Sequence, residues 1–226
     1  MIKFEDVSKS ISENQILKSI NLTISEGEFI SITGHSGAGK STLVHILIGN
    51  IYPDSGRVLV ENFEVSALPP KFLQKYRRNI GVVFQDYKLL PDKKIFENVA
   101  FPLEVCGEKD SVIYDKVIET LEKVQLVKLA DRFPRELSGG EKQRAGIARA
   151  IIHDPKILIA DEPTGNLDPE SSAQIIDLLL KINSEGKTVI LATHSIEAVN
   201  RIKKRVIKLE NGKIDFDKKN SLYPKS

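Results

Sequence analysis

A run of nine residues has the types and spacing of a phosphate-binding loop. It fits the pattern G-x-x-x-x-G-K-[ST] and reads Gly34-His35-Ser36-Gly37-Ala38-Gly39-Lys40-Ser41-Thr42. Glycines let main-chain N–H groups approach a phosphate without a Cβ in the way. A helix that starts at the loop turns its free N–H groups and positive dipole end toward the anion. We expect Lys40 to reach the β- and γ-phosphates of a nucleotide and the Ser41 hydroxyl to ligate Mg²⁺.

Two carboxylates form a second group suited to this chemistry. Asp161 and Glu162 directly follow the apolar run Ile157–Ala160, which predicts a buried strand. Ligands of open α/β sheets bind beyond the carboxyl ends of the strands. Such a pair alone is more often a solvated helix start, but downstream of a phosphate loop it favours hydrolysis. Asp161 would then hold Mg²⁺ through water, and Glu162 would orient or deprotonate the attacking water.

A second helix start carries two adjacent glycines. Ser138 and Glu141 have the spacing of a capping box, which is enough to explain a helix beginning there. Capping does not explain Gly139 and Gly140, because glycine in a helix costs about 1 kcal/mol relative to alanine. Bare backbone at a helix N-terminus suits a second phosphate contact. One nucleotide cannot easily use two such helices of one chain, so a second subunit is expected.

Strands early and late in the chain, with helices between them, are the elements that must position these residues. Helical spacing of apolar residues is found over 43–51 and at Ile113, Val117, Leu121 and Val124, so residues from about 86 to 153 predict a mostly helical insertion. Asn211-Gly212 predicts a hairpin between strands at 206–209 and 213–216. The other predicted strands are Ile2–Val7, Ile16–Ile24, Glu28–Thr33, Arg57–Val60, Ile80–Phe84, Ile157–Ala160 and Thr188–Ala192.

Composition excludes several classes of protein. The chain has 226 residues, 41% of them hydrophobic and 28% charged, which argues against wholesale disorder. Its single cysteine permits neither an internal disulfide nor a cysteine-based zinc site. With 33 Lys+Arg against 31 Asp+Glu the net charge is +2, so an undirected nucleic-acid binder is not expected. The first residues lack an apolar signal core, and apolar runs such as Ile80–Phe84 are far shorter than a membrane span, which predicts a cytoplasmic protein.

The motifs, taken in order, resemble those of the ATP-binding-cassette (ABC) ATPases over essentially the whole length of the chain. They are GHSGAGKS, Gln85, LSGGEKQR, ILIADE, Asp168 in GNLD, and His194. The resemblance implies an α/β P-loop NTPase fold, with a RecA-like mixed sheet, an N-terminal antiparallel β subdomain and a helical insertion. Residues 1–226 would form a single domain, with the catalytic core at about 1–85 and 154–226 and the helical signature subdomain at about 86–153.

The resemblance also assigns roles that the residues alone do not establish. It implies a head-to-tail homodimer with two ATP at the interface, in which each phosphate loop faces the signature Ser138–Glu141 of the other subunit. Gln85 would contact Mg²⁺ or the attacking water, His194 the γ-phosphate, and Asp168 would couple the two sites. Family members usually stack an aromatic residue on adenine where this chain has Ile11. We therefore expect weaker base discrimination and some use of GTP.

Within the family, residues 81–92 and 97–101 are most similar to the cell-division ATPases. The alternatives are the ATPases of lipoprotein release and of MacB-type exporters. Each implies an integral membrane partner and a peripheral position on the cytoplasmic face of the inner (plasma) membrane; the cell-division ATPases would control cell-wall hydrolysis. DNA-repair members of the family place a coiled coil between phosphate loop and signature, whereas the interval here is too short and has no heptads. No nucleic-acid partner is expected.

Clusters of basic residues are open to two interpretations. Most such clusters are solvated faces, but attraction to anionic lipid is worth about 1 kcal/mol per residue near a membrane surface. An anionic membrane surface is thus an additional candidate partner. The clusters lie at 75–78, 93–94, 201–205 and 218–219.

Overall fold

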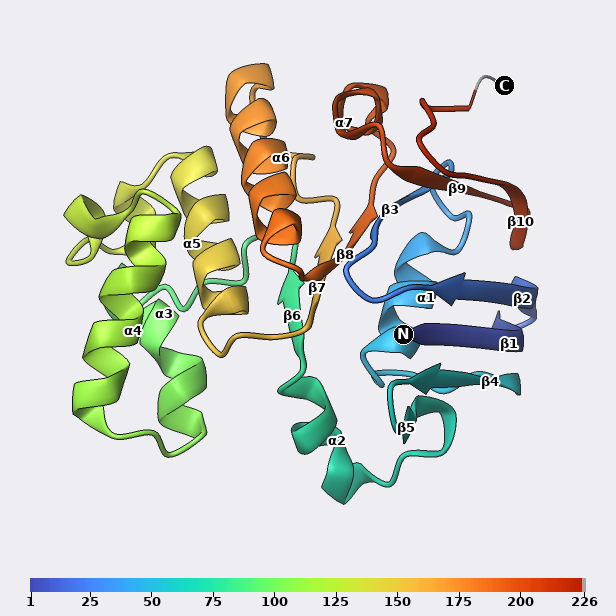
Figure 1. Cartoon of the computed structure of the whole chain (residues 1–226), viewed down its shortest axis with the longest axis horizontal. Coiled ribbons are helices and arrows are strands. Elements are labelled where there is room, and N and C mark those ends of the chain that lie inside the picture. Colours follow the sequence, from blue (N-terminus) through green and yellow to red (C-terminus); the bar gives the residue numbers. More distant parts are fainter. Residues whose placement is uncertain (225–226) are drawn as a thin grey trace.

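Two β-sheets frame the protein in the computed structural model, which describes residues 1–224 (Figure 1). The antiparallel sheet has the order β2-β1-β4-β5, with bounds β1 Ile2–Ile11, β2 Asn14–Ile24, β4 Ser55–Val60 and β5 Phe63–Glu64. The second sheet has the order β10-β9-β3-β8-β7-β6, in which only β10 is antiparallel to its neighbour. Its bounds are β3 Phe29–Thr33, β6 Ile80–Val83, β7 Ile157–Asp161, β8 Thr188–Ala192, β9 Arg205–Glu210 and β10 Lys213–Lys218.

The helices α3, α4 and α5 gather at the end of the molecule opposite β1, β2 and β4 (Figure 1). The α-helices are α1 Lys40–Leu47, α2 Pro70–Arg77, α3 Ile95–Val105, α4 Asp110–Lys123, α5 Gly139–Ile151, α6 Pro169–Ser184 and α7 Ile196–Ile202. Short 3-10 turns occupy Val65–Ala67, Val127–Leu129 and Pro134–Glu136. No helix within residues 1–224 has both the length and the apolar character needed to cross a membrane.

Each face of the six-stranded sheet is covered by a separate hydrophobic cluster. Ile32, Ile159 and Ile190 belong to the cluster that contains α1 and the antiparallel sheet. Leu158 and Leu191, which point to the other face, belong to the cluster that contains α3 to α6. Burial on both faces explains the unbroken apolar runs of the central strands.

The register of the parallel strands positions the chemically active residues. Ile32 of β3 and Asp161 of β7 both pair with Ala192 at the end of β8. The phosphate loop after β3, the carboxylates at the end of β7 and His194 after β8 therefore leave the sheet at one edge. This is the edge at which ligands of open α/β sheets bind.

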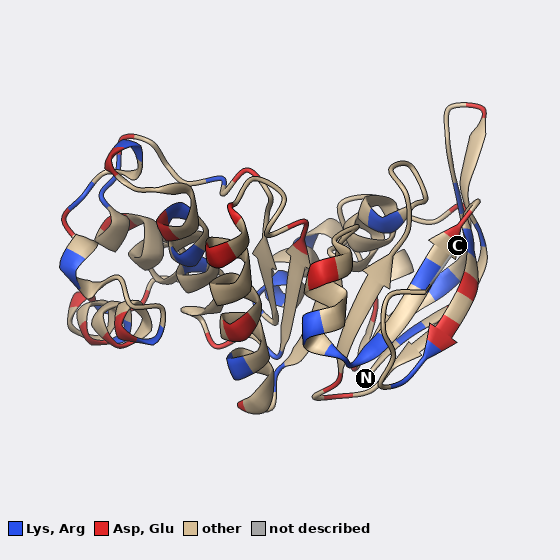
Figure 2. Cartoon of the chain, turned by 90° about the horizontal axis from the view of Figure 1, so that it is seen from above, with Lys and Arg blue, Asp and Glu red and all other residues tan. Residues whose placement is uncertain are grey.

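The predicted elements are present, with differences at their ends. The strands at 2–7 and 16–24 extend toward each other to form a long hairpin, β1–β2. The helix predicted over 43–51 begins at Lys40 and ends at Leu47, because Gly49 has a φ of +68° that stops it. The division into a core and a subdomain at 86–153 remains a prediction, since one cluster runs from α3 and α4 through α5 to α6 and the sheet. Basic and acidic residues are interspersed over both halves (Figure 2).

Candidate nucleotide-binding site

The loop between β3 and α1 requires glycine at the positions that the motif predicts. Gly34, Gly37 and Gly39 have φ values of +149°, +81° and +105°. A Cβ at Gly34 would lie 2.5 Å from the carbonyl oxygen of Leu209, and one at Gly39 would lie 2.7 Å from Cδ2 of Leu17. No side chain of the described residues caps the N-terminus of α1. The first-turn N–H groups therefore remain available to an anion.

Lys40 lies folded over its own loop. Its side chain is only 8% exposed, and Nζ donates to the carbonyl oxygens of Gly34 at 2.8 Å and His35 at 3.2 Å. Nζ also lies 3.8 Å from Oε1 of Glu162. A buried ammonium must be paired, and these contacts hold the charge in place beside the loop.

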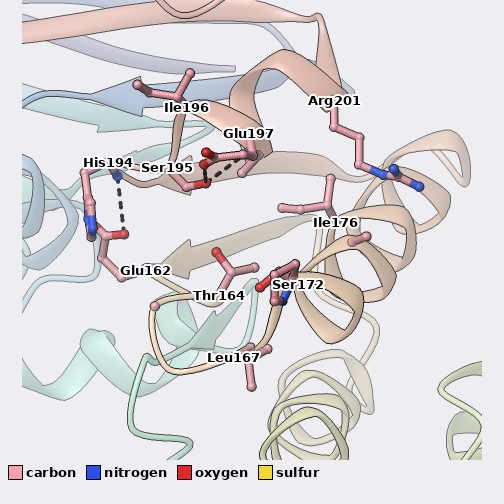
Figure 3. A pocket seen from close by; sticks show the side chains of 14 residues that line it. Glu162, Thr164, Leu167, Ser172, Ile176, His194, Ser195, Ile196, Glu197 and Arg201 are labelled. Atoms are coloured by element: carbon pink, nitrogen blue, oxygen red, sulfur yellow. Dashed lines mark hydrogen bonds and ion pairs between the residues drawn. The ribbon is translucent and has the colours of Figure 1, made fainter.

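Glu162 and His194 form a hydrogen-bonded pair across the strand ends of β7 and β8 (Figure 3). The Nδ1 atom of His194 lies 2.8 Å from Oε1 of Glu162. Oε2 of the same carboxylate accepts from Oγ1 of Thr193 at 3.2 Å and from the main-chain N–H of His194 at 3.3 Å. The exposed fraction is 15% for the Glu162 side chain and 66% for His194, so an inner carboxylate is joined to an outer imidazole.

The backbone of Glu162 is left-handed, with a φ of +47°. This conformation costs a residue with a Cβ about 1–2 kcal/mol. It is held by the N–H of Glu162, which donates to the carbonyl oxygen of Ala192 at 2.9 Å. Strain of this kind concentrates at functional sites, where it aims a side chain.

Ser41 and Asp161 bring two oxygen donors together near the phosphate loop. The Ser41 hydroxyl oxygen lies 3.5 Å from Oδ1 of Asp161. Burial raises the pKa of Asp161, and the contact with Ser41 acts in the opposite direction. A hydroxyl and a carboxylate are hard oxygen ligands, so this donor set fits Mg²⁺.

A cavity of about 590 Å³ joins most of the predicted residues. Ile11, half exposed at 50%, lies at its side together with Ile16, which the sequence reasoning missed. The signal was the β1–β2 hairpin, whose register places Ile11 opposite Asn14 and so brings Ile16 close. The full lining is Ile11, Ile16, His35, Ser36, Gly37, Gly39, Lys40, Ser41, Thr42, Gln85, Glu162 and His194. Of the predicted loop residues, Gly34 and Ala38 do not line the cavity, and a Cβ at Gly34 would lie 2.9 Å from Cβ of Ala38.

Glu162 and His194 also line a second cavity of about 590 Å³ (Figure 3). Its walls come from α6 and the segment before it and from α7, with Leu167, Ile176 and Ile196 as apolar lining. The Glu162–His194 pair is thus shared by two cavities, one of which is lined by the phosphate loop.

The signature residues lie outside both cavities. Glu141 closes a capping box on Ser138: Oε2 of Glu141 accepts from the N–H and the hydroxyl of Ser138, both at 2.8 Å. These hydrogen bonds lower the pKa of Glu141. The glycines also have a packing role that the sequence did not indicate. A Cβ would meet Oγ of Ser171 at 2.9 Å from Gly140, and Cδ2 of Leu167 at 3.2 Å from Gly139.

Gln85 and Asp168 occupy different positions relative to the phosphate loop. Gln85 reaches the cavity and its Nε2 donates to Oδ1 of Asn166 at 3.4 Å. Asp168 does not line the cavity; it caps α6 by accepting the N–H of Ser171 at 2.9 Å, a contact that lowers its pKa. Its predicted role in coupling two sites stays a prediction.

This strand–loop–helix, with its lysine and the carboxylates at the end of β7, a parallel strand separated from β3 by β8, defines a P-loop nucleotide hydrolase. A protein-family model described as "ABC transporter" matches residues 17–165. The cell division ATP-binding protein FtsE of Bacillus subtilis is 47% identical over 99% of this chain and 98% of its own length. FtsE of Mycobacterium tuberculosis is 45% identical, with the same coverage. A dimeric ATP-binding cassette in a post-hydrolysis state with ADP and Pi superposes with a TM-score of 0.88, at 37% identity over 99% of this chain and all of that one.

The chain therefore belongs to the ABC transporter ATP-binding family, among the FtsE cell-division proteins. It is an ATPase, and the predicted fold class and family are confirmed.

Proposed function

We propose that the chain is the ATP-driven component of a membrane complex in cell division. In this proposal a homodimer closes on two ATP and transmits the closure to an FtsX-like integral membrane protein. It would act on the cytoplasmic face of the plasma membrane and thereby control cell-wall hydrolysis. The relatives named for cell division support this function, and the dimeric cassette supports assembly in pairs.

Lys40 and the N–H groups of the phosphate loop hold the β- and γ-phosphates. The three protein contacts of Lys40 keep its charge beside the loop until phosphate oxygens replace them. Ser41, Gln85 and Asp161 would hold Mg²⁺, which neutralises charge on the phosphates when bound. Catalysis of this kind is mainly positioning and charge stabilisation.

Glu162 orients the attacking water and accepts its proton, and His194 contacts the γ-phosphate. The single observation that carries this assignment is the 2.8 Å contact between the two side chains at the edge of the phosphate-loop cavity. Because an ionised carboxylate only accepts, Nδ1 of His194 carries the proton in this contact. For a contact with a phosphate oxygen, Nε2 must carry a proton as well, because an unprotonated ring nitrogen only accepts.

A second copy of the chain supplies the signature. Ser138–Glu141 do not line the phosphate-loop cavity of their own chain, although a helix N-terminus with bare backbone suits phosphate. Head-to-tail pairing would bring this helix start to the cavity of the partner. Two such sites would form together in each dimer.

Replacing Glu162 by glutamine tests the assignment. Glu162→Gln is expected to bind ATP normally, to hydrolyse it at least about a hundredfold more slowly, and to accumulate as a dimer in ATP. Phosphate release measures the rate and light scattering measures the dimer. The control is Glu119→Gln, an exposed carboxylate on α4 paired with Lys123, which should match the wild type. Hydrolysis by Glu162→Gln at the wild-type rate would refute the assignment.

The aliphatic pair Ile11 and Ile16 forms the base side of the site. Aliphatic side chains cover a purine face without the π-stacking that adds about 0.5–1.5 kcal/mol between aromatic partners. We expect ATP and GTP affinities to differ by less than about a thousandfold. Competition between the two nucleotides measures the ratio of their affinities, and a ratio above about a thousandfold would contradict this part of the proposal.

Co-purification from membranes tests the partner, and vesicle flotation tests the lipid surface. Recovery of an FtsX-like protein would support the division complex, whereas recovery of a transport permease would favour a transport ATPase instead.

For the lipid surface, Arg201 and Arg205 already have carboxylate partners, and Arg77 donates to main-chain carbonyls. Lys75 and Arg78 are exposed and form no ion pair within the described residues. Their replacement by glutamate should abolish salt-sensitive binding to anionic vesicles.

A further inference from the structure

Helix α5 holds the segment around Gln85 from both sides. Before Gln85, the fully buried Gln143 donates from Nε2 to the carbonyl oxygen of Phe84 at 3.4 Å. After it, the half-buried Arg149 donates from Nη1 to the carbonyl oxygen of Lys88 at 2.6 Å and from Nη2 to that of Tyr87 at 3.0 Å. The same helix begins at the signature, so one rigid element carries the signature at its start and grips the Gln85 segment near its end.

The part of the segment gripped by Arg149 has an unfavourable backbone. Tyr87 and Lys88 are consecutive left-handed residues, with φ values of +61° and +49°, and both carry a Cβ. Such conformations persist only where the surroundings impose them. The planar guanidinium presents parallel donors that engage two successive carbonyl oxygens together, which a lysine ammonium on a flexible stem cannot reproduce.

Gln85 lies two residues before this strained pair, and its side chain enters the phosphate-loop cavity. Gln85 lies beyond the end of β6 at Val83, and its side chain has one hydrogen bond within the described residues, from Nε2 to Oδ1 of Asn166 at 3.4 Å. Nδ2 of Asn166 donates in turn to the main-chain carbonyl oxygen of Gln85 at 3.4 Å. The direction of the Gln85 side chain therefore depends on where the main chain turns after it.

We propose that Arg149 is a positioning residue for ATP hydrolysis: by fixing the carbonyls of Tyr87 and Lys88 it keeps Gln85 directed into the phosphate-loop cavity, where Gln85 would hold Mg²⁺. This inference rests on the proposed role of Gln85 in the site. Arg149 touches neither the phosphate loop nor the cavity, so it acts on the chemical step and leaves ATP binding to Lys40 and the loop.

The first test is the separation of kcat from KM in Arg149→Lys. Because small displacements of catalytic groups have large effects on rate, kcat should fall about tenfold while KM for ATP stays within about twofold. The matched control is Arg77→Lys, since Arg77 also donates to two successive carbonyls, those of Ile48 and Gly49, at 3.0 and 3.1 Å. The control should keep both constants within about twofold of wild type. Equal losses in the two variants, or a loss in KM alone for Arg149→Lys, would overturn the inference.

The second test asks whether Arg149 acts through Gln85. If it does, the double variant Gln85→Ala with Arg149→Lys is no slower than Gln85→Ala alone, because the second change has nothing left to position. If the rate reductions of the two single variants multiply in the double variant, Arg149 has a general structural role and the inference is overturned. A wild-type rate in Gln85→Ala would refute the proposed role of Gln85 itself. A slow Gln85→Ala beside a fully active Arg149→Lys would refute only the role of Arg149.

Discussion

The N-termini of α1 and α5 both carry glycines, but the first is uncapped and the second is capped by side chains. Helix α1 begins after the left-handed Gly39 with no side-chain cap. By contrast, α5 begins at Gly139 after the N-cap Ser138, which forms a complete capping box with Glu141 in the first turn. The first start exposes N–H groups beside a buried lysine. At the second, the N–H of Glu141 donates to the Ser138 hydroxyl, and the Glu141 carboxylate accepts from the N–H and the hydroxyl of Ser138.

This difference separates phosphate binding that a single chain can provide from phosphate binding that requires a dimer. An anion meets N–H groups and a positive charge at α1, so this site is ready within one chain. At α5 an anion meets a negatively charged Glu141 that is already hydrogen-bonded within its own helix. A phosphate is therefore expected to reach α5 only when the other contacts of a dimer offset that repulsion.

Lys40→Ala gives the largest effect in this comparison. Removing the ammonium deletes charge-assisted hydrogen bonds to the phosphates, so ATP affinity should fall at least about a hundredfold. Equilibrium binding of a fluorescent ATP analogue measures the loss. Lys71→Ala, an exposed lysine on α2, serves as the control. Unchanged affinity in Lys40→Ala would remove the distinction between the two helix starts.

Alanine substitutions at Gly39 and Gly140 should change the free energy of unfolding by different amounts. Gly39→Ala forces a left-handed residue with a Cβ against Leu17, which should cost about 2 kcal/mol in the free energy of unfolding. Gly140→Ala gains helix propensity of about 1 kcal/mol, but its Cβ crowds Ser171, so the net change should stay within about 1 kcal/mol. Urea denaturation measures both. Equal losses would mean that the strain at Gly39 is not special.

Ser138→Ala should affect turnover more than binding. The change removes a cap worth about 1 kcal/mol and a hydroxyl that the proposed dimer would bring to the phosphate of the partner, so hydrolysis should fall about tenfold. ATP affinity of the single chain should remain unchanged, since Ser138 lies outside the cavity. Parallel rate and binding measurements decide this. Weaker ATP binding by the isolated chain would place Ser138 in the site of its own chain.

Glu141→Gln should have the smallest effect, a change in how thermal stability depends on pH. Hydrogen bonds from Ser138 lower the pKa of Glu141 from its ordinary 4.5. A lowered folded-state pKa contributes stability above about pH 4.5, and that stability is lost as the pH falls through the folded-state value. The difference in Tm between wild type and Glu141→Gln should therefore narrow on going from about pH 6 to about pH 3. A constant difference would argue against an ionised cap.

Local patterns were enough to predict the strands, the phosphate loop and the capping box at Ser138. These features depend on neighbouring residues: apolar runs, glycines at fixed spacing, and a serine three residues before a glutamate. What could not be predicted depends on contacts between distant segments. The packing of Gly140 on Ser171 and the grip of Arg149 on Tyr87 arise only when α5 lies beside α6 and the Gln85 segment.

The phosphate-loop cavity was also only partly predictable from the sequence. Its phosphate side could be listed from one motif, but its base side includes Ile16, whose place depends on the turn of the β1–β2 hairpin. The left-handed backbone of Glu162 was likewise invisible in the sequence, because glutamate seldom adopts it. The pairing of Glu162 with His194 follows from adjacent parallel strands, which the order of motifs alone does not specify.

The position of β3 in the sheet has a consequence for how the protein is made. The strand that carries the phosphate loop lies between β8 and β9, and Gly34 packs against the carbonyl of Leu209. A ribosome releases residues 29–42 long before it makes residues 188–210. The loop therefore waits through most of translation without either neighbouring strand. The nascent chain therefore has no assembled ATP site until residues 188–210 have been synthesised, so nucleotide binding reports that both strands beside β3 are in place.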